Sequence, residues 1–143
     1  MNSEELRVCE TDVIYDSERP IHLAYDETGD ILEVVFDGGE ATTAVELTDN
    51  ILLRFNHERG LAVGLTILDF SLLARPTEMG PQSFPLTGLD DLPEELRQTV
   101  VKIITTPPVN RFLKVSSLYA PPAPCIPITT VERLPALASA VDK

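Results

Sequence analysis

The sequence predicts an α+β fold in which an antiparallel β-meander of four or more strands is covered by one helix. Three observations support this. Residues 20–72 contain short apolar segments that alternate with polar residues and are separated by turns with glycine. Residues 91–105 instead carry apolar side chains every three or four positions. Eleven of the twelve prolines follow residue 72, which separates the predicted meander from a proline-rich second half.

The N-terminal segment, residues 1–19, could add a strand to this meander. The sequence of residues 13–18, VIYDSE, is similar to that of residues 23–28, LAYDET. Six positions are too few to establish a duplication, so the extra strand stays one reading of this segment.

The first strands of the meander are expected at residues 21–25, 31–36 and 44–47. The turn after the first contains Asp26, which can begin a turn, and Gly29, which can take a positive φ near its end. Residues 37–39, Asp-Gly-Gly, separate the second strand from the third. Each strand has one apolar face, as expected for a half-buried sheet.

The clearest hairpin pairs residues 51–56 with residues 61–68. Both segments alternate, and the four-residue turn between them ends in Gly60, where a positive φ is expected. Asp69 follows the second strand and is expected to anchor a turn. A sheet with one apolar face needs a covering layer.

The helix over residues 91–105 is the predicted cover. Asp91 is expected to be its N-cap, because Pro93 and Glu94 follow in the arrangement of a capping box. Pro107 is expected to stop it, because a proline disfavours helical backbone in the residue before it.

The rest of the second half has fewer signals. Residues 72–90 read as a loop, either packed or mobile. Residues 111–119 could form one strand, and residues 120–127 hold four prolines and must be extended. Residues 129–143 could form a short helix or fray. This loop, helix, strand and proline-rich tail (residues 73–143) are expected to pack on the meander.

The charge is concentrated in the first half of the chain. The net charge is −12, made up of −4 in residues 1–20, −8 in residues 21–71 and zero in residues 72–143. An acidic surface repels nucleic acid and anionic membranes and favours encounter with a basic protein. Simple solubility is the plainer reading. No segment resembles a membrane helix or an export signal, so a cytoplasmic location and two reduced thiols, Cys9 and Cys125, are expected.

No metal or cofactor is predicted. His22 and His57 are the only histidines and lack the spacing of a zinc site. Asp26, Thr28 and Asp30 are spaced like the start of a calcium loop, but Ile31 occupies the position where that loop requires glycine. The pair Gly38-Gly39 lacks the lysine and helix of a phosphate loop.

No catalytic residue is predicted either. Ser71, Ser116 and Ser117 lie outside any Gly-x-Ser-x-Gly setting, and Cys125 lies among prolines with no marked partner. Acidic pairs arise by chance in a chain with 23 acidic residues.

Residues 20–72 resemble the bacterial and archaeal domain-of-unknown-function family 2283. The resemblance is carried by Tyr25-Asp26 with Asp30-Ile31-Leu32, by residues 50–53 (NILL), and above all by residues 60–71, GLAVGLTILDFS. It implies a small β-rich unit and no activity. Some members look like antitoxin-type partners of small toxins, which is a weak association.

Two functions from different classes are therefore expected. The first is a non-catalytic, antitoxin-like or regulatory interaction module that meets a basic partner through Asp26, Glu27, Asp30 and Glu33, with the proline-rich stretch as an arm. The second is a self-assembling structural or small-ligand-binding domain that pairs through sheet edges. An enzyme of unknown class is a third alternative.

Overall fold

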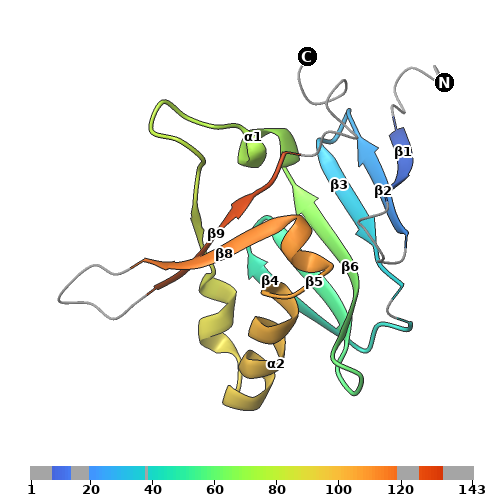
Figure 1. Cartoon of the computed structure of the whole chain (residues 1–143), viewed down its shortest axis with the longest axis vertical. Helices are drawn as coiled ribbons and strands as arrows, with labels where there is room; N and C mark the ends of the chain where they lie inside the picture. The colour runs from blue at the N-terminus through green and yellow to red at the C-terminus, as the bar shows by residue number, and fades with distance from the viewer. Residues whose placement is uncertain (1–7, 14–19, 38, 119–125, 134–143) are drawn as a thin grey trace.

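The computed structural model describes residues 8–13, 20–37, 39–118 and 126–133, and it contains two antiparallel sheets and several short helices (Figure 1). The larger sheet has the order β1-β2-β3-β6-β5-β4. Its strands are β1 (Val8–Val13), β2 (Ile21–Asp26), β3 (Ile31–Val35), β4 (Thr43–Thr48), β5 (Ile51–Asn56) and β6 (Leu61–Leu68). The α+β class and the antiparallel sheet predicted from the sequence are confirmed.

This sheet is made of two three-strand meanders that meet along β3 and β6. The strands β1, β2 and β3 are consecutive neighbours in one half of the sheet, and β4, β5 and β6 are consecutive neighbours in the other. The two meanders join where Val34 pairs with Leu65 and Leu32 with Ile67. The extra strand expected in residues 1–19 is present at residues 8–13. Residues 14–18, most of the segment that is similar to residues 23–28, lie outside the described part.

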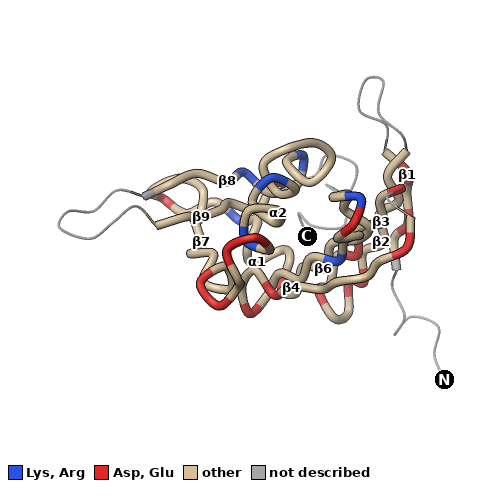
Figure 2. Tube along the Cα trace, turned by 90° about the horizontal axis from the view of Figure 1, so that it is seen from below, with Lys and Arg blue, Asp and Glu red and all other residues tan. Residues whose placement is uncertain are grey.

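The second half supplies a layer over one face of the sheet. It contains α1 (Phe70–Ala74), β7 (Phe84–Pro85), the 3₁₀ helix η2 (Thr87–Asp91), α2 (Glu94–Ile104), the 3₁₀ helix η3 (Val109–Arg111), β8 (Leu113–Leu118) and β9 (Ile126–Val131). The strands β7, β9 and β8 form the smaller sheet in that order. Figures 1 and 2 both place α2 and β8 on the same side of the larger sheet.

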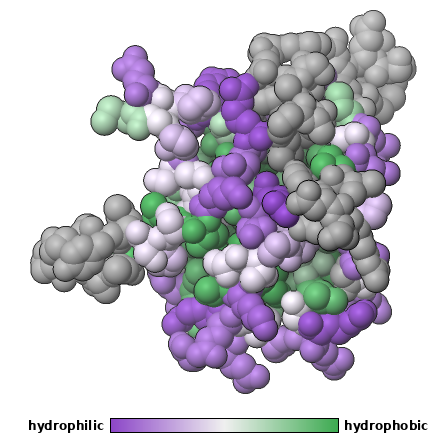
Figure 3. All heavy atoms as spheres, in the orientation of Figure 1, coloured by the Kyte–Doolittle hydropathy of each residue, from purple (hydrophilic) through white to green (hydrophobic). Residues whose placement is uncertain are grey.

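The core lies between these two layers. Side chains at alternate positions of the sheet, such as Leu53 and Leu65, are completely buried. The helix α2 meets them with Val100, Ile103 and Ile104, which confirms the apolar stripe expected of a covering helix. Where the outer surface of this layer is visible in Figure 3, it is mostly hydrophilic, with small hydrophobic areas between polar ones.

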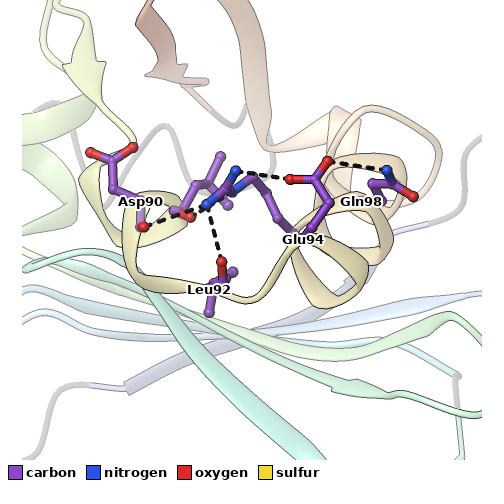
Figure 4. A network of polar contacts seen from close by, with 6 residues as sticks. Asp90, Leu92, Glu94 and Gln98 are labelled. Carbon is purple, nitrogen blue, oxygen red and sulfur yellow. Dashed lines mark hydrogen bonds and ion pairs between the residues drawn. The ribbon is translucent and has the colours of Figure 1, made fainter.

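The helix begins three residues later than predicted, and Asp91 is not its N-cap. Asp91 ends η2, while Pro93 is the N-cap residue of α2 and makes no side-chain capping hydrogen bond. Leu92 precedes a proline and is extended, at φ −90° and ψ 143°, so the helix cannot include it. Arg97 stabilises this junction instead. Its guanidinium donates to the carbonyls of Leu89 and Leu92 at 2.9 and 3.0 Å and pairs with Glu94 at 3.1 Å (Figure 4).

Three further expectations need correction. The positive φ in the first turn belongs to Asp30 (φ 55°) and not to Gly29. Residues 72–90 are not a plain loop, because they contain the end of α1, β7 and part of η2. The start of the predicted terminal helix at residue 129 belongs to the strand β9, which pairs with β8. Residues 134–143, the rest of that predicted helix, lie outside the described part.

Candidate functional site

The second face of the larger sheet is the candidate site, because the described elements leave it open. Side chains that alternate with the core residues point to this side, which we call the outer face. Two of its apolar side chains, Val35 and Leu68, are 47% and 40% exposed. In Figure 2 the covering layer with α2 and β8 lies on the opposite side of the sheet.

The outer face combines apolar and acidic side chains. Strand register places five carboxylates and seven apolar side chains on it, with one guanidinium, that of Arg54, and one imidazole, that of His22. The carboxylates belong to Glu10, Asp12, Asp26, Glu33 and Glu46, and the apolar side chains to Ala24, Ile31, Val35, Ala44, Leu52, Leu61 and Leu68. The face is therefore strongly acidic.

A hydrogen-bonded group lies at the centre of the outer face. The Glu33 Oε2 atom accepts from Arg54 Nη2 at 3.1 Å and from the Thr66 hydroxyl at 2.8 Å. Gly64 is the cross-strand partner of Arg54, and a Cβ at Gly64 would lie only 2.5 Å from Arg54 Nη2. The absence of a side chain at Gly64 thus allows the guanidinium to lie against the sheet.

His22 extends the polar part of this face toward β1. Its Nδ1 atom lies 2.8 Å from an Asp12 carboxylate oxygen, and its Nε2 atom lies 3.8 Å from Glu10. His57 instead contacts the ring of Phe55 edge-on, at the far end of β5. Within the described residues, no three His, Cys, Asp or Glu side chains form a group that could hold a metal ion.

A second polar cluster, formed by Tyr25, Asp30 and Ser71, lies at one end of the sheet. The Tyr25 hydroxyl donates to Asp30 Oδ1 at 2.6 Å, and the Ser71 backbone N–H donates to the same oxygen at 2.9 Å. The Ser71 hydroxyl donates to Asp30 Oδ2 at 2.8 Å. Burial, and next the hydrogen bond to the Asp30 carboxylate, raise the pKa of Tyr25 well above its ordinary value.

This cluster connects two chain reversals. Asp30 ends the turn between β2 and β3, and its carbonyl accepts from the Phe70 N–H at 3.0 Å at the start of α1. Asp69, just before α1, also has a positive φ of 56°, and its carboxylate accepts from the Asn50 amide at 3.0 Å. Both oxygens of Asp30 are occupied by internal donors, and the Ser71 hydroxyl donates to one of them. The arrangement holds the turns together and has no activated nucleophile.

The residues predicted to form one acidic surface are divided between these two places. Asp26 and Glu33 point to the outer face, although Asp26 also accepts from the backbone N–H groups of Thr28 and Gly29 at 3.0 and 3.3 Å. Glu27 lies in the turn and is half-buried. Asp30 is used internally. Gly60 has the positive φ, 65°, that its place in the turn requires.

Sequence reasoning did not identify the outer-face residues Glu46, Leu52 and Leu68. Their alternation was visible, but alternation alone cannot say which face of a sheet will be covered. Of the two cysteines, Cys9 is a free thiol packed at the edge of the core, and Cys125 lies outside the described residues. None of the described helices is long and apolar enough to span a membrane.

Comparison with known proteins identifies part of the chain. No curated protein and no solved structure matches it. A family model, in contrast, matches a segment that begins in β2 and ends at Ser71. This segment contains both residues of the Asp30–Ser71 pair and most of the outer face. Of the covering layer it includes only Phe70 and Ser71, the first two residues of α1. Residues 22–71 match the family described as "Protein of unknown function (DUF2283)", which confirms the family resemblance drawn from the sequence.

Proposed function

We propose that this protein is a non-catalytic interaction module that binds a basic partner protein through the outer face of its six-stranded sheet. One observation carries the proposal: apolar side chains are exposed on a sheet face that also carries five carboxylates. The family match is neutral on this point, because it assigns no activity.

The exposed apolar side chains favour a docking surface. The exposed Leu68 lies beside its half-buried cross-strand partner Ile31, and the exposed Val35 lies at the other end of β3, where it pairs with His22 and Gly64. Contiguous apolar patches on a soluble protein mark sites of interaction more often than isolated apolar residues do. The apolar side chains of the outer face lie on a rigid, hydrogen-bonded surface formed by strands β2, β3, β6, β5 and β4. This surface would lose little conformational entropy on binding.

The charge of this face selects the class of partner. Five carboxylates against one guanidinium would attract a basic surface and increase its rate of encounter. The same charge would repel the phosphates of nucleic acids and anionic lipids. A basic protein is therefore the favoured partner.

Self-assembly is the second candidate, and it also rests on a specific observation. Lys102 and Lys114 are exposed and belong to α2 and β8, which lie on the side of the larger sheet opposite the outer face (Figure 2). A basic surface on one copy could meet the acidic face of another. Such a head-to-tail contact would produce rings or filaments, because it uses two different surfaces.

The test is recovery of the tagged full-length protein from its source cells at moderate salt, followed by reconstitution with the purified partner. We expect a stoichiometric basic protein that dissociates at high salt. Val35→Lys should abolish its binding, because it replaces an exposed apolar side chain of the outer face with a cation that would repel a basic partner. Met79→Lys is the matched control, because Met79 is 95% exposed but lies outside the larger sheet.

Three outcomes would contradict the proposal. The first is recovery of the protein alone, and the second is a partner that Val35→Lys still binds at wild-type affinity. The third is a defined oligomer of the purified protein that Val35→Lys and Lys114→Glu both disrupt, which would support self-assembly instead. Circular dichroism of each variant must first show a native sheet.

A further inference from the structure

Two hollows flank β4, and they share the side chains of Glu46, Thr48 and Asp49 as a common wall. The first, the apolar hollow, opens on the outer face and has a volume of about 220 Å³. The second, the acidic hollow, lies between β4 and η2 and has a volume of about 390 Å³. Neither is lined by Tyr25, Asp30 or Ser71.

Local backbone geometry produces both hollows. The pairing of β4 with β5 shifts register between Glu46 and Thr48, and the turn that follows is closed by a hydrogen bond from the Asn50 N–H to the Thr48 hydroxyl at 3.0 Å. On the other side of β4, Gly88 in η2 packs so closely that a Cβ there would overlap the Glu46 carbonyl oxygen. Because η2 touches β4 at this glycine, a hollow remains beside the contact.

The apolar hollow has the size and lining to hold one aliphatic side chain. Leu52, Thr66 and Leu68 form its walls, and Leu68 is 40% exposed. Its volume is below the roughly 300–1,000 Å³ of pockets that hold drug-sized ligands. A single buried apolar anchor in such a pocket is the usual centre of a protein interface.

The acidic hollow complements a cation. Three acidic residues line it, Glu46, Asp49 and Asp91. Glu46 and Asp49 are exposed, and among the described residues no Lys or Arg forms an ion pair with any of the three. A lysine or arginine side chain that entered here would meet negative charge from both β4 and η2.

We infer that the two hollows together bind an extended segment of the basic partner, which inserts one aliphatic side chain into the apolar hollow and a lysine or arginine into the acidic hollow. This inference rests on the proposed function and names the feature that the partner must present. The hollows share three lining residues, Glu46, Thr48 and Asp49, so the two side chains that fill them must lie close together in the partner. Residues two apart in an extended chain are separated by about 7 Å and point to the same side, which keeps two such side chains close together.

The test uses a synthetic seven-residue peptide, capped at both ends, with leucine and lysine two positions apart among serines. It is titrated to millimolar concentration into the ¹⁵N-labelled full-length protein. We expect the amide signals of Asp49, Leu52 and Gly88 to shift together. Replacing the peptide's leucine with alanine should weaken binding about tenfold, and replacing its lysine with glutamate should abolish it.

Protein variants make the test specific. Leu68→Ser should weaken peptide binding about tenfold, whereas Val35→Ser, on the same face but outside the hollow, should leave it unchanged. Asp91→Asn should weaken binding, and the effect should disappear at high salt, where the wild-type affinity also falls. Glu95→Gln, an exposed acid in the first turn of α2, is the matched control.

Each contrary result has a definite meaning. Shifts confined to other parts of the outer face would overturn this inference and leave the proposed function standing. Absence of any shift would overturn the inference as well. Concentration-dependent shifts of the same amides without peptide would show that a second copy occupies the hollows. If Val35→Lys failed to bind the cellular partner while Leu68→Ser still bound it, the proposed function would be supported. The inference about the hollows would be overturned, because the partner would bind elsewhere on the outer face.

Discussion

The carboxylate of Asp30 joins two parts of the chain that are 41 residues apart, and its replacement gives a direct measurement of that link. In Asp30→Ala, the Tyr25 hydroxyl loses its acceptor at 2.6 Å, and the Ser71 N–H and hydroxyl lose theirs at 2.9 and 2.8 Å. The backbone bond from Phe70 to the Asp30 carbonyl remains possible. The variant therefore removes three hydrogen bonds without removing apolar contacts.

The expected loss of stability follows from these bonds. Each contributes roughly 1 kcal/mol net, so the free energy of unfolding should fall by about 3 kcal/mol. Alanine also tolerates the positive φ at this position less well than aspartate, which adds to the loss. Asp30→Asn keeps one acceptor oxygen and a residue suited to positive φ, so it should lose about half as much.

Urea denaturation of the full-length protein at neutral pH measures these differences. The slope with denaturant should stay unchanged, because the surface exposed on unfolding is the same. Asp49→Ala is the matched control, since Asp49 is an exposed turn aspartate, and it should cost less than about 0.5 kcal/mol. If Asp30→Ala were as stable as Asp49→Ala, the three hydrogen bonds would contribute nothing, and the cluster would not hold the two turns together.

Three further perturbations test other parts of the structure. The pKa of Tyr25 lies above the ordinary tyrosine value near 10, so the neutral hydroxyl stabilises the fold fully below pH 10 and progressively less above it. Tyr25→Phe has no hydroxyl to ionise. In thermal melts at alkaline pH, it should therefore lose less stability with rising pH than the wild type does. Leu65→Asp buries a carboxylate in the core and should unfold the domain, whereas Leu68→Asp, on the outer face, should melt within a few degrees of the wild type. Gly88→Ala should cost about 1–3 kcal/mol in urea melts, because its Cβ would displace η2 from the Glu46 carbonyl.

The parts of the fold that depend on neighbouring residues could be predicted from the sequence. The hairpin of β5 and β6 has matched alternation and a turn that ends in Gly60, so its strands were placed almost to the residue. The pairing of β3 with β6 could not be predicted in this way. It joins residues about thirty positions apart, and any of several alternating strands could have been the neighbour of β3.

Local signals also misled where a tertiary contact competes with them. Asp91, Pro93 and Glu94 have the spacing of a capping box, yet Arg97 donates to the carbonyls of Leu89 and Leu92, and this stabilises a 3₁₀ turn before the helix. The same limit applies to β9. The sequence predicts a short helix or a frayed end for residues 129–143, but residues 126–131 form a strand because β8 offers a partner.

The candidate site, too, could be predicted from the sequence only in part. Acidic residues in the first half were correctly recognised as abundant, but their roles depend on the side of the sheet to which each points. Glu33 and Asp30 are three residues apart and were expected to share a surface. Glu33 lies on a strand, where alternation directs it to the outer face, whereas Asp30 lies in a turn and is directed to Ser71. A count of acidic residues along the sequence cannot distinguish the roles of Glu33 and Asp30. The strand register is needed to say which side chains lie on the binding surface.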